Sequence, residues 1–254
     1  MTKEVQSLEV LFTPAEFAAL RERDLSNTSC AVFDVLRATS SMVNALANGA
    51  EAIVPVSEIA EALAIRERKP GVLLAGERDG VRILSDLTGG VAFDLGNSPR
   101  EFTREKVNGK TIATTTTNGT RALRACAGAK VVLAASFLNL RATAEQLATA
   151  ENVILVCSGT YDQAAYEDVL AAGAMCELLW PTHGAGAVSD SARMARRFYL
   201  LEKDDLLAAV SSSRNGSRLL SIPDLRDDVA FCVQRDIFPL LAELGKDGSI
   251  TAAL

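Results

Sequence analysis

The chain of 254 residues carries 26 basic and 32 acidic side chains, giving a formal net charge of −6, and 48% of its residues are apolar. This length supplies a large apolar core, and the acidic balance, without any block of Lys and Arg, argues against nucleic acid as a partner. No apolar run reaches the about 18 residues that a membrane helix needs, and residues 1–4 lack an apolar signal core, so we expect a cytoplasmic protein with no membrane partner.

Eight apolar, β-rich runs predict strands, at residues 9–12, 30–35, 52–56, 72–76, 111–116, 131–136, 153–157 and 229–234. Helix signals lie between most of them. Thr13-Pro14-Ala15-Glu16 and Ser98-Pro99-Arg100-Glu101 have the pattern of capping boxes, a helix over residues 39–47 ends at Asn48-Gly49, and another begins at Ser57. Residues 164–220 are mostly helical in pattern.

This alternation predicts an α/β fold, layered α/β/α, with a mixed, largely parallel sheet. We treat residues 1–254 as a single domain, because composition marks no boundary. The pattern also allows two intimately packed lobes with a cleft between them.

Several common catalytic motifs are absent. The five cysteines show no Cys-x-x-Cys spacing, so we expect buried apolar side chains rather than disulfides or a zinc site. The single histidine, His183, lies in a loop-like stretch, and we expect it to be solvated. Gly109-Lys110-Thr111 matches the end of a phosphate-binding loop, but Arg104 stands in place of its first glycine. No cysteine has an arginine six residues later, which excludes a cysteine phosphatase loop.

Polar clusters follow several predicted strands, where open α/β sheets bind their ligands. Each also has an ordinary structural explanation as a cap, a solvated turn or an ion pair. Asp34 could hold a hard cation, Arg37 could bind phosphate or sulfonate, and the turn at Asn118-Gly119 offers N–H groups at a helix start. The clusters are Asp34-Val35-Leu36-Arg37-Ala38-Thr39-Ser40, Gly76-Glu77-Arg78-Asp79-Gly80, Phe93-Asp94-Leu95-Gly96-Asn97-Ser98-Pro99 and Thr114-Thr115-Thr116-Thr117-Asn118-Gly119-Thr120-Arg121.

Taken together, these strings resemble the 2-phosphosulfolactate phosphatase family, magnesium-dependent enzymes of coenzyme M biosynthesis. Weaker matches are Ser136-Phe137-Leu138-Asn139, Cys157-Ser158-Gly159-Thr160, Glu167-Asp168 and residues 228–236. The resemblance implies a mixed-sheet α/β fold with a cleft lined by these motifs. The chain departs from the family pattern in a few extra residues between Arg78 and Phe93, where we expect residues 85–90 to form a loop over the cleft, in Asp162 and Ala165, and in Asn215, where many members carry histidine.

The resemblance implies Mg²⁺-dependent hydrolysis of 2-phosphosulfolactate, or of a related phosphorylated hydroxy acid, to sulfolactate and phosphate. Some of Asp34, Glu77, Asp94 and Glu167 or Asp168 would hold Mg²⁺; on a helix the last two point about 100° apart, so only one easily faces the site. The expected catalytic residues are Asp34, Arg37, Glu77, Arg78, Asp94 and Asn118. The expected substrate-binding residues are Thr39, Ser40, Asn97, Thr116, Thr117, Gly119 and Thr120.

Two further points stay open. A phosphometabolite-binding protein with little or no turnover is the alternative, motivated by Asn215 and the altered segment between Thr160 and Glu167. A covalent phosphoenzyme is also open, although neither Cys157 nor any serine has a visible histidine base. The partner that we expect is a small anionic phosphoester, and the apolar composition is compatible with a homodimer.

Overall fold

The computed structural model describes residues 6–78 and 80–253. The predicted lack of an apolar leader in residues 1–4, and Asp79 of the second polar cluster, therefore lie outside the described residues. No helix within those two ranges is both long enough and apolar enough to cross a membrane.

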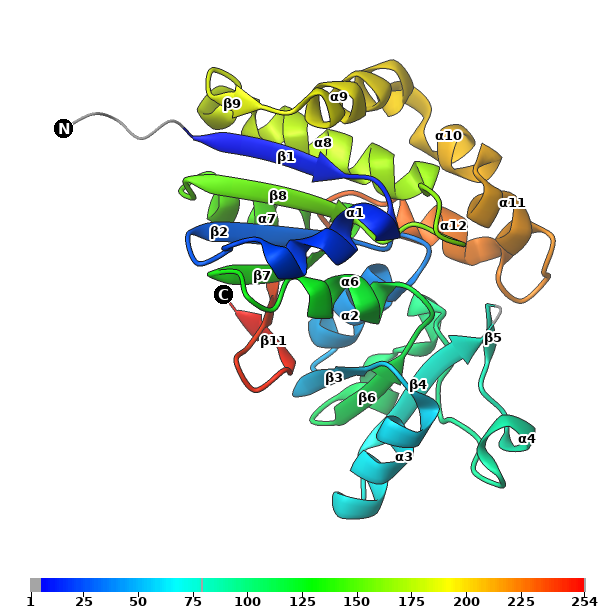
Figure 1. Cartoon of the computed structure of the whole chain (residues 1–254). Helices are drawn as coiled ribbons and strands as arrows, with labels where there is room; N and C mark the ends of the chain where they lie inside the picture. Colours follow the sequence, from blue (N-terminus) through cyan, green and yellow to red (C-terminus); the bar gives the residue numbers. More distant parts are fainter. Residues whose placement is uncertain (1–5, 79, 254) are drawn as a thin grey trace.

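A single sheet runs through the molecule (Figure 1). Its strands are β1 (Ser7–Leu11), β2 (Thr28–Phe33), β3 (Ala52–Val56), β4 (Leu73–Arg78), β5 (Val81–Arg82), β6 (Thr111–Thr115), β7 (Val131–Ala135), β8 (Asn152–Cys157), β9 (Ala187–Val188), β10 (Leu241–Leu244) and β11 (Ile250–Ala253). Their order across the sheet is β5-β4-β6-β3-β11-β10-β7-β2-β8-β1-β9.

The sheet consists of two parallel groups joined by an antiparallel hairpin. Strands β7, β2, β8, β1 and β9 pair in parallel, as do β4, β6 and β3. The hairpin β10–β11 lies between the groups, and β11 meets β3 through the single pair Ile250 and Ile53. The predicted mixed, largely parallel sheet is confirmed.

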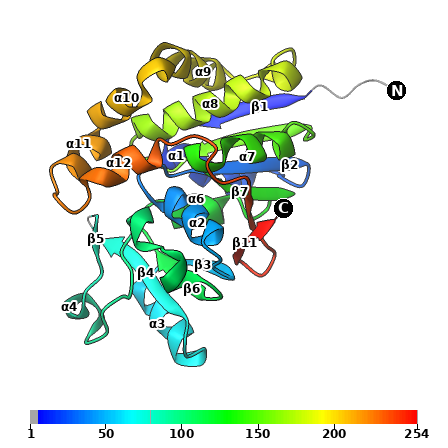
Figure 2. The same ribbon diagram turned by 180° about the vertical axis from the view of Figure 1, so that it is seen from behind.

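Helices cover both faces of the sheet (Figures 1 and 2). They are α1 (Pro14–Ala18), α2 (Ala38–Ala47), α3 (Ile59–Arg68), α4 (Ser85–Thr88), α5 (Arg104–Val107), α6 (Gly119–Ala125), α7 (Leu140–Leu147), α8 (Tyr166–His183), α9 (Asp190–Glu202), α10 (Leu206–Ser212), α11 (Arg214–Leu220) and α12 (Arg226–Cys232). Because side chains alternate along a strand, Ala31 and Phe33 of β2 pack in the core that includes α8, whereas Cys30 and Val32 pack in the core that includes α2 and α6. The layered α/β/α prediction is confirmed.

Seven of the eight predicted strands are present, with ends within two residues of the prediction. The predicted strand at residues 229–234 is wrong, because α12 occupies this segment. Val229 and Cys232, three residues apart, are buried on one face, and the acidic Asp227 and Asp228 stand in the first turn, where the helix dipole favours them.

Local signals had mixed outcomes. The capping box at Thr13 is confirmed, since its hydroxyl accepts the N–H of Glu16 and the Glu16 carboxylate accepts the N–H of Thr13. The capping box at Ser98 is wrong: Pro99–Glu101 is a single 3₁₀ turn, and the Ser98 hydroxyl makes no cap hydrogen bond. His183 is not solvated but fully buried at the end of α8, with its Nε2 3.0 Å from the carbonyl oxygen of Ala150. All five cysteines are free and buried, as predicted.

Candidate active site

A cleft of about 670 Å³, including its open mouth, lies where both parallel groups end. Asp34 follows β2, Glu77 stands near the end of β4, and Thr160 follows β8. The cleft collects residues from all four predicted clusters. Those that line it are Asp34, Leu36, Arg37, Glu77, Gly80, Asn97, Thr116, Thr117 and Asn118.

Asp34 is held at the bottom of the loop between β2 and α2. Its Oδ1 accepts the N–H of Ala38 at 2.9 Å. A Cβ atom at Gly119 would lie 2.8 Å from Asp34 Oδ2 and 2.7 Å from the Ala38 Cβ, so only glycine allows α6 to begin this close. Burial raises the pKa of Asp34 to about 7, and the carboxylates of Glu77 and Glu167 act in the same direction.

Glu167 and Asp168 begin α8 and are both almost fully buried, with 1% and 2% exposure. Asp168 accepts the N–H of Val35 at 2.8 Å and that of Gly159 at 3.2 Å, so its two oxygens tie the ends of β2 and β8 together. Burial raises the pKa of Asp168 well above its usual range, and neighbouring Glu167 and Asp34 add to the effect.

Glu167 differs from Asp168 in having an oxygen to spare. Its Oε1 accepts the side-chain amide of Asn215 at 2.6 Å, whereas its Oε2 is buried without a hydrogen-bond partner. A buried polar atom without a partner costs roughly 1–3 kcal/mol. The free oxygen therefore marks Glu167, rather than Asp168, as the carboxylate available to a ligand.

Both carboxylate oxygens of Glu77 accept hydrogen bonds. Its Oε1 accepts both the N–H and the hydroxyl of Thr117 at 3.0 Å, and its Oε2 accepts the N–H of Gly80 at 2.7 Å. Its side chain thus joins the turn after β4 to the turn after β6. Glu77 shapes the wall of the cleft.

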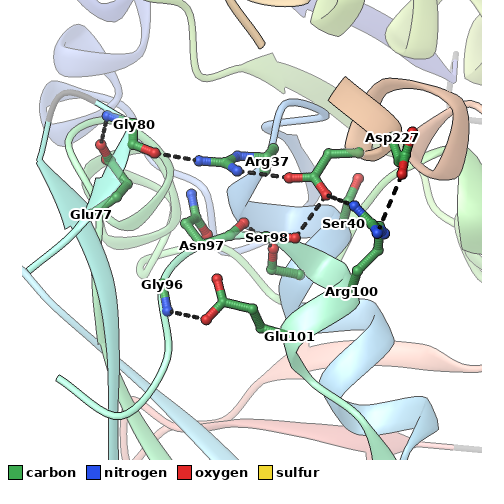
Figure 3. A network of polar contacts seen from close by, with 12 residues as sticks. Arg37, Ser40, Glu77, Gly80, Gly96, Asn97, Ser98, Arg100, Glu101 and Asp227 are labelled. Carbon is green, nitrogen blue, oxygen red and sulfur yellow. Dashed lines mark hydrogen bonds and ion pairs between the residues drawn. The ribbon is translucent and has the colours of Figure 1, made fainter. Parts of the chain in front are cut away.

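Arg37 is buried, with 3% exposure, and forms an ion pair with Asp228 of α12 at 2.7 Å. Its second terminal nitrogen donates to the carbonyl oxygen of Gly80 at 2.8 Å, and the Ser98 hydroxyl donates to the other oxygen of Asp228 at 2.7 Å. Figure 3 shows this network beside the cleft. Asp228 fixes the guanidinium of Arg37, and only the weak family match at residues 228–236 pointed to it in the sequence.

Arg78 and Asp94 are placed away from the cleft. Arg78 turns to the other side of β4, where it donates to the hydroxyl of Thr115 at 3.1 Å and to the carbonyl oxygen of Glu77 at 2.7 Å. Asp94 accepts the N–H of Leu74 at 2.7 Å and pairs with Arg66. These contacts hold the loop after residue 93 against β4 and leave Asp94 outside the group formed by the other acids.

The remaining predicted hydroxyl groups support the cleft from behind. Thr39 and Ser40 donate to the carbonyl oxygens of Asp34 and Val35 at 3.0 and 2.8 Å, at the start of α2. Thr120 donates to the carbonyl oxygen of Thr116 at 3.1 Å. These side chains fix the turns rather than face the ligand space.

Other residues in the cleft wall come from α11, where the sequence had drawn attention to Asn215 alone, and from the loop after β8. Asn215 and Arg218 of α11 line the cleft together with Tyr161. Asn215 also donates to the hydroxyl of Thr160 at 2.8 Å, so its amide connects α11, the end of β8 and Glu167. The expected loop over the cleft is not found: residues 85–90 line neither the cleft nor its neighbouring cavity, and α4 lies at the outer end of the sheet (Figure 1).

Carboxylate oxygens in and behind the cleft are of the chemical type that could hold a hard cation. Within the described residues, no group of three or more His, Cys, Asp and Glu side chains is arranged as a closed metal cage. Mg²⁺, however, is commonly held by one or two carboxylates together with water and substrate phosphate. Asp34 Oδ2 and Glu167 Oε2 could supply those carboxylate oxygens, and a cation beside them would offset the crowding of negative charge.

Known proteins resemble this chain over most of its length. A model of the family described as 2-phosphosulpholactate phosphatase matches residues 16–247. A probable 2-phosphosulfolactate phosphatase of Thermotoga petrophila is 41% identical over 84% of this chain and 87% of its own length. Proteins of the same description from Caldanaerobacter subterraneus subsp. tengcongensis and Clostridium acetobutylicum are 35% and 33% identical, over 94% and 88% of this chain and 97% and 92% of their own lengths. The chain therefore belongs to the 2-phosphosulfolactate phosphatase family.

Proposed function

We propose that this protein hydrolyses 2-phosphosulfolactate, or a closely related phosphorylated hydroxy acid, to the hydroxy acid and phosphate with Mg²⁺ bound in the cleft. The observation that carries the proposal is the unpartnered, buried Oε2 of Glu167, close enough to Asp34 to raise its pKa, behind a cleft that Asp34 and Arg37 line. Its support is the family to which the chain belongs.

The residues of this chain would bind and orient the phosphoryl group. Arg37 is locked in place by Asp228 and presents a planar donor to charge that develops on the phosphoryl oxygens. The hydroxyl of Thr116 is buried without a partner, so it can donate to a phosphoryl oxygen without giving up another contact. Glu77 keeps Thr117 and Gly80 in position around this space.

Asp34 and Glu167 would hold the cation, and Asn215 fixes the carboxylate of Glu167 so that its Oε2 stays available. Mg²⁺ at this position would supply Lewis-acid polarisation of the phosphoryl group.

A binding protein with little turnover is the second candidate, and one observation favours it. The cleft lining contains no histidine among the described residues, because His183 lies buried at the far end of α8 and position 215 is an asparagine. An amide can hold a ligand or a carboxylate, but it cannot transfer a proton at neutral pH.

Phosphate release separates the two candidates. We expect the protein to release phosphate from 2-phosphosulfolactate. This phosphate release should stop in EDTA and recover when excess Mg²⁺ is added. Tight calorimetric binding of the phosphoester without phosphate release would establish the binding protein instead. Full turnover in EDTA would remove the cation from the proposal and leave Asp34 and Glu167 without their assigned role.

A further inference from the structure

A second cavity, of about 960 Å³ including its open mouth, adjoins the cleft. The two spaces share Arg37, Gly80, Asn97 and Ile222 in their walls, so one ligand can extend from the first into the second. The outer wall of the second cavity is formed by β5, the turn at Pro99–Glu101 and the segment between α11 and α12. Figure 3 shows part of this region.

Arg82 supplies a positive charge to the wall of this cavity. In the hairpin β4–β5 it is paired directly with Glu77, and directly opposed residues of antiparallel strands stand on the same side. Arg82 therefore stands on the side of the hairpin that faces the cleft, whereas Arg78, paired with Val81, stands on the other. Among the described residues, Arg82 makes no ion pair, and its hydrogen bond to the carbonyl oxygen of Asp94 is long, at 3.4 Å.

Asn97 provides an unused amide at the boundary between the two spaces. Only 8% of the residue is exposed, and its main-chain carbonyl accepts the hydroxyl of Ser41 at 2.7 Å. Its side-chain amide makes no hydrogen bond to any residue within 6–78 or 80–253, although it can donate two. Figure 3 shows this side chain near Arg37 and Gly80. Because this amide lines both spaces and has no protein partner among the described residues, a ligand in either space can contact it.

Arg100 is a second cation that can reorient at little cost. Its contacts with Asp227 and Asp228 are long, at 3.4 and 3.6 Å, and 41% of its side chain is exposed. The exposed pair with Asp227 contributes at most about 1 kcal/mol, and the buried Asp228 has the closer Arg37 as its main partner. Two acids line the same cavity: Glu101, whose Oε2 accepts the N–H of Gly96 at 2.9 Å, and the exposed Asp224.

We propose that Arg82, Arg100 and Asn97 form a subsite for the sulfonate of the substrate while its phosphoryl group lies in the cleft. This rests on the proposed function above, because it needs a substrate with two strong oxyanions on neighbouring carbon atoms. The planar fork of arginine matches a three-oxygen anion. Arg78 does not take this part, because its guanidinium is committed to Thr115 and Glu77 on the opposite side of β4.

Kinetics on two substrates test the subsite. The substrates are 2-phosphosulfolactate and 2-phospholactate, which keeps the phosphate and carboxylate but lacks the sulfonate. Arg82→Gln should raise KM for 2-phosphosulfolactate by about tenfold or more, the scale of a lost charge-assisted hydrogen bond, and leave kcat/KM for 2-phospholactate nearly unchanged. Arg82→Lys keeps the positive charge but loses the planar fork of the guanidinium. Its KM for 2-phosphosulfolactate should lie between those of the wild-type protein and Arg82→Gln. The matched control is Arg68→Gln. Arg68 is an exposed arginine at the end of α3, and its change should leave the KM of both substrates unaltered.

Equal losses on both substrates, or no loss on either, would overturn the subsite. Calorimetric binding of sulfolactate and lactate in the presence of Mg²⁺ keeps this test separate from that of the hydrolase. Wild-type protein should bind sulfolactate at least about tenfold more tightly than lactate, and Arg82→Gln should remove that preference. Preference for sulfolactate without phosphate release would contradict the proposed hydrolysis alone, whereas equal binding of the two acids would contradict the subsite alone.

Discussion

Asp34 lines one wall of the cleft at the end of β2, and Glu167 is buried near it at the start of α8; each has a carboxylate oxygen for which the described residues supply no hydrogen bond. Glu77 stands on the opposite wall, on β4, and its two oxygens accept three hydrogen bonds from Thr117 and Gly80. Only the first wall has an acid with a pKa raised to about 7. Acids around one cleft can therefore have separate roles: crowded carboxylates with an unpaired oxygen suit a cation, and a carboxylate with all its hydrogen bonds made suits the shaping of turns.

Two arginines of the region also differ in whether their charged groups have a carboxylate partner. Arg37 is committed to Asp228 through a buried pair at 2.7 Å, whereas Arg82 has no carboxylate partner among the described residues. A locked guanidinium fits the reacting group, whose position must be exact to fractions of an ångström. A free one fits the recognition of a substrate end that varies between related compounds.

The strongest test of the comparison is Asp34→Asn. Asparagine keeps an oxygen for the N–H of Ala38 and removes the negative charge, so the fold should survive and kcat should fall by ~10²–10³-fold, as for other lost electrostatic groups. Steady-state phosphate release at saturating Mg²⁺ measures this. Asp204→Asn, at an exposed position far along the chain, is the control. A loss smaller than about tenfold would remove Asp34 from the cation site.

Asp228→Asn tests whether Arg37 owes its position to the buried pair. The change leaves the Arg37 charge buried without its carboxylate, which should lower the free energy of unfolding by about 3–5 kcal/mol. We expect kcat to fall as well, by about 10²-fold, because the guanidinium is no longer fixed. Urea unfolding and kinetics at low temperature measure the two effects. Ser98→Ala, which removes one hydrogen bond to Asp228, should cost only about 1 kcal/mol and keep most activity.

Glu77→Gln distinguishes shaping from chemistry on the second wall. The single side-chain oxygen of glutamine can accept the hydrogen bonds of one of the two turns. Its amide nitrogen cannot accept a hydrogen bond from the other turn. The loosened turns should raise KM by about tenfold while kcat changes less, which is the signature of lost binding rather than lost transition-state stabilisation. A fall of kcat by about 10²-fold at unchanged KM would instead place Glu77 at the reacting group.

The pH dependence of stability tests the crowding of negative charge around Asp34. An acid whose pKa is raised by folding holds its proton more tightly in the folded chain, so the folded state loses stability as pH rises through the window between the two pKa values. For Asp34 this window extends from its ordinary 3.8 to about 7. In EDTA, the melting temperature should therefore fall between pH 5 and pH 8, by about 2–4 °C for each kcal/mol. Asp34→Asn should flatten this fall, and a melting temperature that rises over this range would contradict it.

Local signals in the sequence predicted the parallel strands, because runs such as Val153-Ile154-Leu155-Val156 are apolar on both faces and buried on both. The apolar run after Asp228 has the same composition, and periodicity alone does not separate a short buried helix from a strand. Strands β10 and β11 carry Glu243 and Thr251 and are only four residues long, so neither stood out.

The candidate site residues also divide into those that local sequence could place and those that it could not. Asp34, Glu77 and Asn118 follow predicted strands and could be assigned to one edge of a sheet from their positions in the chain. Asp94 lies in an equally good motif, yet the N–H of Leu74 and the guanidinium of Arg66 hold it elsewhere, and these contacts join residues 20 and 28 positions apart. Asp228 reaches Arg37 across 191 positions of chain. Such partners depend on the packing of whole elements, so no local pattern reveals them.

The hairpin β10–β11 lies in the middle of the sheet although every other described strand precedes it in the chain. During translation, the strands of both parallel groups are therefore synthesised before the hairpin β10–β11 that connects the groups in the sheet. Until residues 241–253 leave the exit tunnel, the edges of β7 and β3 stay unpaired, and such open edges favour association between chains. The two walls of the cleft cannot be joined through the sheet before that moment, so the ability to bind a phosphoester should arise late in synthesis and all at once.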